Sequence, residues 1–200
     1  MTEGRIRKLD SLFSQNTPIL QAAKLRAVGF CGKDIAELLH AGKLHRVRRG
    51  YYAQAQAESD LGGFEVIASL VPEGVLSFFS AAQYHDLSTV IPQSIEITLP
   101  SDARTPVLPK NIHVKVYKSI PSIHGIGVEI ARVDNVMIKM YDKERTVCDF
   151  VRMRLKIGKD AALEVLKNYM AGKKNLQKLY GYARRLQIEG VLHPYLEVLV

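Results

Sequence analysis

The stretch of residues 42–53, GKLHRVRRGYYA, constrains the fold of this chain more than any other segment. Gly42 is typical of a helix C-terminus, and the residues after it alternate as in a short strand. The chain then turns at Arg49 and Gly50 and returns through Tyr51 and Tyr52. Five side chains of the stretch are basic or can become so, and none is acidic: Lys43, His45, Arg46, Arg48 and Arg49. The sequence therefore predicts a helix that leads directly into a basic β-hairpin.

Three helices are predicted before this hairpin. Apolar residues at helical spacing indicate a first helix over residues 4–15. Thr17 and Pro18 have the pattern of an N-cap followed by the first residue of a second helix, which ends at Gly29. The third helix places Ile35, Leu38 and Leu39 on one face and ends at Gly42. Three helices and a hairpin in this order predict a winged helix-turn-helix over residues 1–56.

A winged helix presents its third helix and its hairpin to DNA, and Lys and Arg side chains there neutralise phosphates. The predicted DNA-contacting residues are Lys33, His40, Lys43, Arg46, Arg48 and Arg49. Strand alternation puts Arg46 and Arg48 on the same side as Leu44, so only some of these arginines can face DNA. The alternative is an arginine-rich surface hairpin without a nucleic-acid partner.

The rest of the chain is predicted to form an α+β domain over residues 60–200, after a polar linker over residues 54–63. Its C-terminal part is predicted to be helical. The expected helices span residues 61–71, 76–87, 142–155, 159–170, 176–188 and 191–200, and the expected strands span residues 94–100, 113–117, 127–133 and 136–140. The fold class is thus α+β, with an N-terminal winged helix followed by a mixed α/β domain.

Charge is partitioned along the chain. Residues 1–53 hold ten Lys and Arg against four Asp and Glu, residues 54–135 hold five against nine, and residues 136–200 hold thirteen against seven. Such a partition favours local anionic partners over a uniformly basic surface.

Cys31 and Cys148 lie far apart without ligand-spaced histidines, so we expect neither a zinc site nor a disulfide, and no cofactor. Without an apolar signal core or membrane span, a cytoplasmic protein is expected.

Catalysis is the weaker alternative. Glu96 and Asp86 offer carboxylates for a metal-dependent nuclease, but Glu96 and Thr98 alternate on one face and are interpreted as a solvated strand edge. His85 is interpreted as a hydrogen-bonded helix end rather than a ligand. The helical spacing of Arg145, Asp149 and Arg152 predicts pairing within one helix. The sequence therefore predicts a protein that is not an enzyme.

Three segments in order resemble the AbiEi-type antitoxins of bacterial type IV toxin–antitoxin (abortive-infection) systems. They are the predicted wing GKLHRVRRGYY (residues 42–52), LSFFSAAQYHDL (residues 76–87) and ERTVCDF (residues 144–150). The chain departs from the family where many relatives cap the third helix with Ser or Thr, because Cys31 and Gly32 stand there. The motif residues of the second and third segments are Ser80, His85, Arg145, Thr146 and Asp149, for which a structural role is expected.

The resemblance implies an antitoxin that represses its own operon by binding double-stranded operator DNA. It also implies that the C-terminal domain counters a nucleotidyltransferase toxin, by a route that the motifs leave open. Two alternatives remain open: a winged-helix transcriptional regulator, or a protein-interaction module without a toxin partner. The leucines of residues 136–200 suit either an interaction surface or a domain core.

Overall fold

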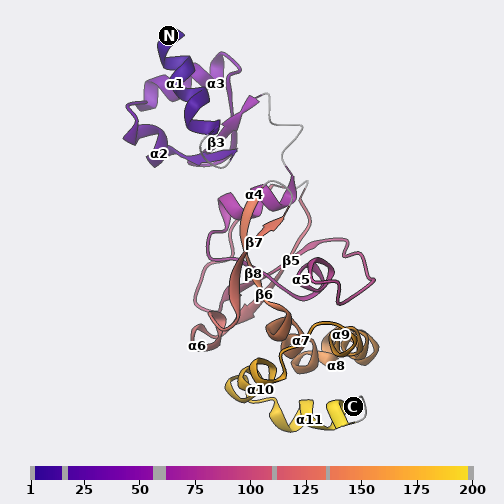
Figure 1. Cartoon of the computed structure of the whole chain (residues 1–200). Coiled ribbons are helices and arrows are strands. Elements are labelled where there is room, and N and C mark those ends of the chain that lie inside the picture. The colour runs from indigo at the N-terminus through magenta and orange to yellow at the C-terminus, as the bar shows by residue number, and fades with distance from the viewer. Residues whose placement is uncertain (1–2, 15–17, 56–61, 110–111, 134–135, 198–200) are drawn as a thin grey trace. The chain divides into compact units, whose positions relative to one another are not determined.

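The computed structural model describes residues 3–14, 18–55, 62–109, 112–133 and 136–197 (Figure 1). The chain divides into two compact units. Unit 1 comprises Met1–Pro72, Pro106–Ile112 and Arg132–Met137; unit 2 comprises Glu73–Thr105, His113–Ala131 and Ile138–Val200. The domain bounds at residues 56 and 60 stay a prediction, since residues 56–61, most of the expected linker, lie outside the described residues.

Unit 1 begins with three helices and three strands. In chain order these are α1 (Glu3–Ser14), β1 (Ile19–Gln21), α2 (Ala22–Ala27), α3 (Gly32–His40), β2 (Leu44–Arg48) and β3 (Tyr51–Gln54). The strands form an antiparallel sheet in the order β1-β3-β2. The helix α4 (Gly63–Leu70) follows. An apolar core joins the helices to the sheet through Leu9, Leu25, Phe30, Leu38 and Leu44, each at most 2% exposed.

The second predicted helix begins later than expected. Pro18 is not helical, Ile19–Gln21 form β1, and α2 covers only Ala22–Ala27; Thr17, the predicted cap, lies outside the described residues. Ile19 pairs with Ala53 and Leu20 with Tyr52 across the antiparallel ladder. This pairing with the returning strand of the hairpin satisfies the backbone of residues 19–21 in extended form, so it replaces the first turn of the predicted helix.

Unit 2 carries a five-stranded sheet in the order β6-β5-β4-β8-β7. Its strands are β4 (Val75–Leu76), β5 (Ile95–Pro100), β6 (Val114–Ser119), β7 (Val128–Val133) and β8 (Val136–Tyr141). β4 pairs antiparallel with β5 and parallel with β8, while β5 and β6 are parallel. The sheet is therefore mixed, and its centre is its shortest strand.

The helices of unit 2 are α5 (Phe78–Tyr84), α6 (Pro121–His124), α7 (Lys143–Arg152), α8 (Arg154–Ile157), α9 (Lys159–Ala171), α10 (Leu176–Arg185) and α11 (Glu189–Glu197). Figure 1 shows α7 through α11 gathered in one part of this unit. α7 packs against α5, α9, α10 and α11, so it is the central helix of the cluster. Val147, Phe150 and Leu179 are fully buried there. These helices and strands confirm a mixed α+β fold with a helical C-terminal part.

The predicted elements of unit 2 are confirmed with small shifts, apart from two segments. The single helix expected over residues 142–155 is divided at Met153 into α7 and α8. Residues 76–87 were predicted as a helix, but Leu76 belongs to β4 and α5 begins only at Phe78. Leu76 pairs with Ile97 and with Met140, which are distant in sequence. Local periodicity carries no information about strand pairing with residues distant in sequence. The short helix α6 was not predicted either.

Candidate nucleic-acid interface

The helix α3 is held in unit 1 by its apolar face. Ile35 and Leu38 are buried against the same core as Leu44 of β2, and α3 packs directly on β2. A helix fixed along one face presents the opposite face to solvent. Gly42, with φ of +61°, takes the left-handed conformation that ends the helix and starts the hairpin.

The start of α3 is fixed by an acidic side chain rather than by Ser or Thr. Cys31 is the N-cap, and its backbone N–H donates to Asp34 Oδ2 at 2.7 Å. Arg5 of α1 donates to both carboxylate oxygens of Asp34, at 2.7 and 2.9 Å. Hydrogen bonds from the Cys31 side chain and backbone, and then Arg5, hold the pKa of Asp34 below its ordinary value. Cys31 therefore serves as the cap although the usual hydroxyl is missing.

The structure places the predicted contact residues on the outer side of α3 and on the hairpin. Lys33 and His40 are exposed on α3, and Lys43 is exposed just after it. Arg46 and Arg49 are exposed on the hairpin, whereas Arg48 is half-buried. All six predicted contact residues therefore lie on α3, on the hairpin that follows it, or on the turn between them.

The hairpin is irregular where the arginines lie. Its register shifts between Arg46 and Arg48, where Arg46 pairs with Tyr52 and Arg48 with Tyr51. The guanidinium carbon of Arg48 lies 4.1 Å from the centre of the Tyr51 ring, a cation–π contact that occupies this side chain. The register is regular from Leu44 to Arg46, so these two side chains share a side of the strand as predicted, with Leu44 buried and Arg46 exposed further along it. Arg46, whose guanidinium carbon lies 5.9 Å from the centre of the Tyr52 ring, and Arg49 are the exposed arginines of the hairpin.

Two motif residues of unit 2, His85 and Thr146, bond to one backbone carbonyl. His85 ends α5 and is 7% exposed, and its Nε2 donates to the Tyr141 carbonyl at 2.8 Å. Thr146 Oγ1 donates to the same oxygen at 3.4 Å. Ser80 lies elsewhere on α5, where its Oγ accepts from the backbone N–H of Glu96 at 2.9 Å. The two motif segments therefore meet at Tyr141, which sequence spacing did not predict.

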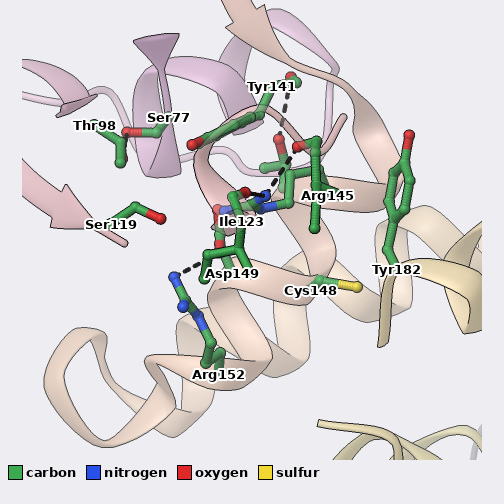
Figure 2. A network of polar contacts seen from close by, with 12 residues as sticks. Ser77, Thr98, Ser119, Ile123, Tyr141, Arg145, Cys148, Asp149, Arg152 and Tyr182 are labelled. Carbon is green, nitrogen blue, oxygen red and sulfur yellow. Dashed lines mark hydrogen bonds and ion pairs between the residues drawn. The ribbon is translucent and has the colours of Figure 1, made fainter. Parts of the chain in front are cut away.

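Arg145 is the centre of a buried polar network (Figure 2). It is fully buried, its Nε donates to Asp149 Oδ2 at 3.0 Å, and its Nη1 donates to the carbonyls of Ile123 and Ile126 at 2.6 and 2.9 Å. Its guanidinium carbon lies 4.2 Å from the centre of the Tyr141 ring. Arg152 Nη2 donates to the other oxygen of Asp149 at 3.0 Å. The predicted pairing of Arg145, Asp149 and Arg152 within one helix is confirmed.

Burial shifts the titration of this network. It raises the pKa of the Asp149 carboxyl, against the opposing pull of the two guanidinium groups. It also raises the pKa of the Cys148 thiol to about 12, so this thiol is protonated at neutral pH. The buried ion pairs of Asp149 with Arg145 and Arg152 hold α7 in place, and the buried, protonated Cys148 thiol is not an exposed nucleophile.

The interpretation of Glu96 and Thr98 as a solvated edge was wrong. β5 is not an edge strand, since it lies between β6 and β4. Both side chains are 3% exposed, because α5 packs on β5 and Thr98 donates to Ser77 just before that helix. The Glu96 carboxylate accepts from the Phe79 backbone N–H at 2.7 Å and from the Tyr117 hydroxyl at 3.0 Å, and Lys115 Nζ lies 3.2 Å away. Asp86, the other proposed nuclease carboxylate, is exposed after α5. In the described part of the chain, no cluster of three His, Cys, Asp or Glu residues could hold a metal ion.

A hollow of about 600 Å³ in unit 2 was not predicted. It lies where α7 and α10 begin, and Lys178 bridges Asp142 and Glu144 in it at 3.1 and 3.0 Å. Its lining is His85, Glu129, Asp142, Lys143, Glu144, Lys173, Lys174, Asn175, Leu176 and Lys178. These residues come from four separate segments, so no local motif could have indicated it.

No protein-family model matches this chain, and no curated protein matches it. The resemblance to AbiEi-type antitoxins therefore stays an interpretation of the three motif segments. Across the residues that the structure describes, no helix is long and apolar enough to cross a membrane.

Proposed function

We propose that this chain binds double-stranded DNA through a winged helix formed by α1, β1, α2, α3, β2 and β3. The observation that carries the proposal is the exposure of Lys33 and His40 on α3, followed directly by exposed Lys43 and a hairpin with exposed Arg46 and Arg49. The support for a winged helix is the order of these elements and the sheet order β1-β3-β2. In this arrangement α3 enters the major groove, and the hairpin contacts the flanking phosphates.

The finer part of the proposal rests on the family resemblance. We propose that the chain is an antitoxin that represses its own operon and counters a nucleotidyltransferase toxin through unit 2. The segments of residues 76–87 and 144–150 support this, since His85 of the first and Thr146 of the second bond to the same carbonyl of Tyr141. Co-expression with a nucleotidyltransferase encoded beside its gene tests this part, and growth arrest that the full chain does not relieve would count against it.

The DNA-binding part is tested by fluorescence anisotropy of the full chain on DNA from upstream of its own gene, over a salt series. Affinity should fall steeply with salt, because bound Lys and Arg release counterions. Combined Arg46→Ala and Arg49→Ala substitutions should flatten the salt slope by about one unit for each lost phosphate contact.

A matched control removes the same charge from α1 through Arg7→Ala and Lys8→Ala, both of which replace exposed side chains. This variant should keep the salt slope of the wild type. Equal slopes for the hairpin variant and the wild type would show that the hairpin does not contact DNA.

A further inference from the structure

The outer face of α3 carries one acidic side chain, which lies between Lys33 and His40. Lys33, Ala36, Glu37 and His40 are exposed, and their spacing of three and four residues places them in one row along the helix. Ile35 and Leu38 form the buried side. Glu37 therefore lies in the middle of the row that the proposed function turns toward DNA.

The two carboxylates of α3 are used differently. Asp34 is engaged by the Cys31 backbone and by Arg5, as part of the helix start. No hydrogen bond or ion pair reaches the Glu37 carboxylate from any residue that the structure describes. Lys33, one turn away, is not within ion-pair distance of it either. Among the residues that the structure describes, both carboxylate oxygens of Glu37 are therefore free to accept a hydrogen bond.

A free carboxylate in the major groove discriminates among bases. It is repelled by phosphates on every sequence, and only a base that donates a hydrogen bond offsets this repulsion. Guanine and thymine present acceptors in that groove, and adenine presents an acceptor beside its amino group. Cytosine presents its N4 amino group as a donor alone.

We propose that Glu37 is a specificity-determining residue that selects cytosine by accepting a hydrogen bond from its N4 amino group. This inference rests on the proposed DNA binding by α3. Lys33 lies about 6 Å N-terminal to Glu37 along the helix axis, roughly two base-pair steps, and its ammonium suits the acceptor pair of a guanine. The row therefore reads at least two positions with opposite chemistry.

The test selects binding sites from a random double-stranded DNA library with the full chain and with Glu37→Gln. Glutamine keeps the size of the side chain but binds the N6 and N7 atoms of adenine. The preference at one position should change from cytosine to adenine, by on the order of tenfold, while the other positions keep theirs. Affinity for random DNA should rise, because a negative charge is removed.

Glu3→Gln on α1 is the matched control, since it removes the same charge from a side chain that is 89% exposed. It should leave the selected sequence unchanged. A Glu37→Gln protein that selects the wild-type sequence, or binds every sequence more tightly with an unchanged profile, would overturn the role of Glu37 while leaving DNA binding intact. A wild-type chain that binds no DNA in a salt-dependent way would overturn the proposed function itself.

Discussion

Gly127 and Arg145 approach so closely that a β-carbon on Gly127 would lie 2.6 Å from the Cβ of Arg145. Gly127 also has φ of +72°, a left-handed conformation that residues with a side chain rarely adopt. Its carbonyl accepts from the Asp142 backbone N–H at 2.8 Å, directly at the start of α7. The loop before β7 and the first turn of α7 are therefore fitted to each other at this glycine.

Gly127→Ala should destabilise unit 2 by about 2 kcal/mol or more, because strain in the backbone adds to the contact with Arg145. Urea unfolding followed by circular dichroism measures the change. Gly125→Ala is the control, since a β-carbon there meets no atom within 4 Å and φ is −77°. Equal stabilities of the two variants would contradict the close fit.

Arg145→Ala should cost about 3–5 kcal/mol of stability, because it leaves the buried Asp149 with one guanidinium only and removes the donors to two carbonyls. Arg145→Lys should recover part of this loss, since an ammonium keeps the charge but lacks the planar set of donors. Arg152→Ala should cost less, because its side chain is 27% exposed. The three variants are compared by their unfolding midpoints. An Arg145→Ala protein with the midpoint of the wild type would refute a structural role for the network.

The two cysteines should differ in reactivity. Cys31 is exposed, whereas Cys148 is buried with a pKa raised to about 12. An aromatic disulfide reagent at pH 8 should modify one thiol per native chain and two per chain in denaturant. Cys31→Ser should remove the native reaction entirely. Rapid modification of Cys148 in the native chain would contradict its burial.

Asp34 should make the stability of unit 1 depend on pH in the acidic range. Its pKa is lowered in the folded chain from the ordinary value of 3.8, so the folded state binds the proton less readily than the unfolded state. The resulting stabilisation is complete above the unfolded pKa and is lost as the pH falls through the folded pKa. The Tm difference between the wild type and Asp34→Asn should therefore be largest above about pH 4 and shrink below it. A difference that stays constant down to pH 2 would exclude this linkage, and Glu37→Gln serves as an exposed control.

The sequence pattern predicted the features that depend on residues close together in the chain. Periodicity and caps predicted α3, α7 and the basic hairpin, and helical spacing predicted the pair of Arg145 and Asp149. The start of β1 at Ile19 was missed, because its partner Ala53 is far along the chain. Glu96 was misplaced for a related reason. Alternation shows that a strand has two faces, but only the packing of α5 and α6 on β5 shows that they are covered. The meeting of His85 and Thr146 at Tyr141 depends on packing between α5 and α7, which no motif encodes.

The shortest strand of unit 2 also sets the order in which its sheet can assemble. β4 contributes Val75 and Leu76, yet Leu76 pairs with Ile97 on one side and Met140 on the other. The pair of β5 and β6 and the strand β8 become one sheet only after both distant partners have reached this residue. Forming such contacts costs loop-closure entropy before packing compensates for it, so we expect this unit to fold more slowly than a bundle of its helices would.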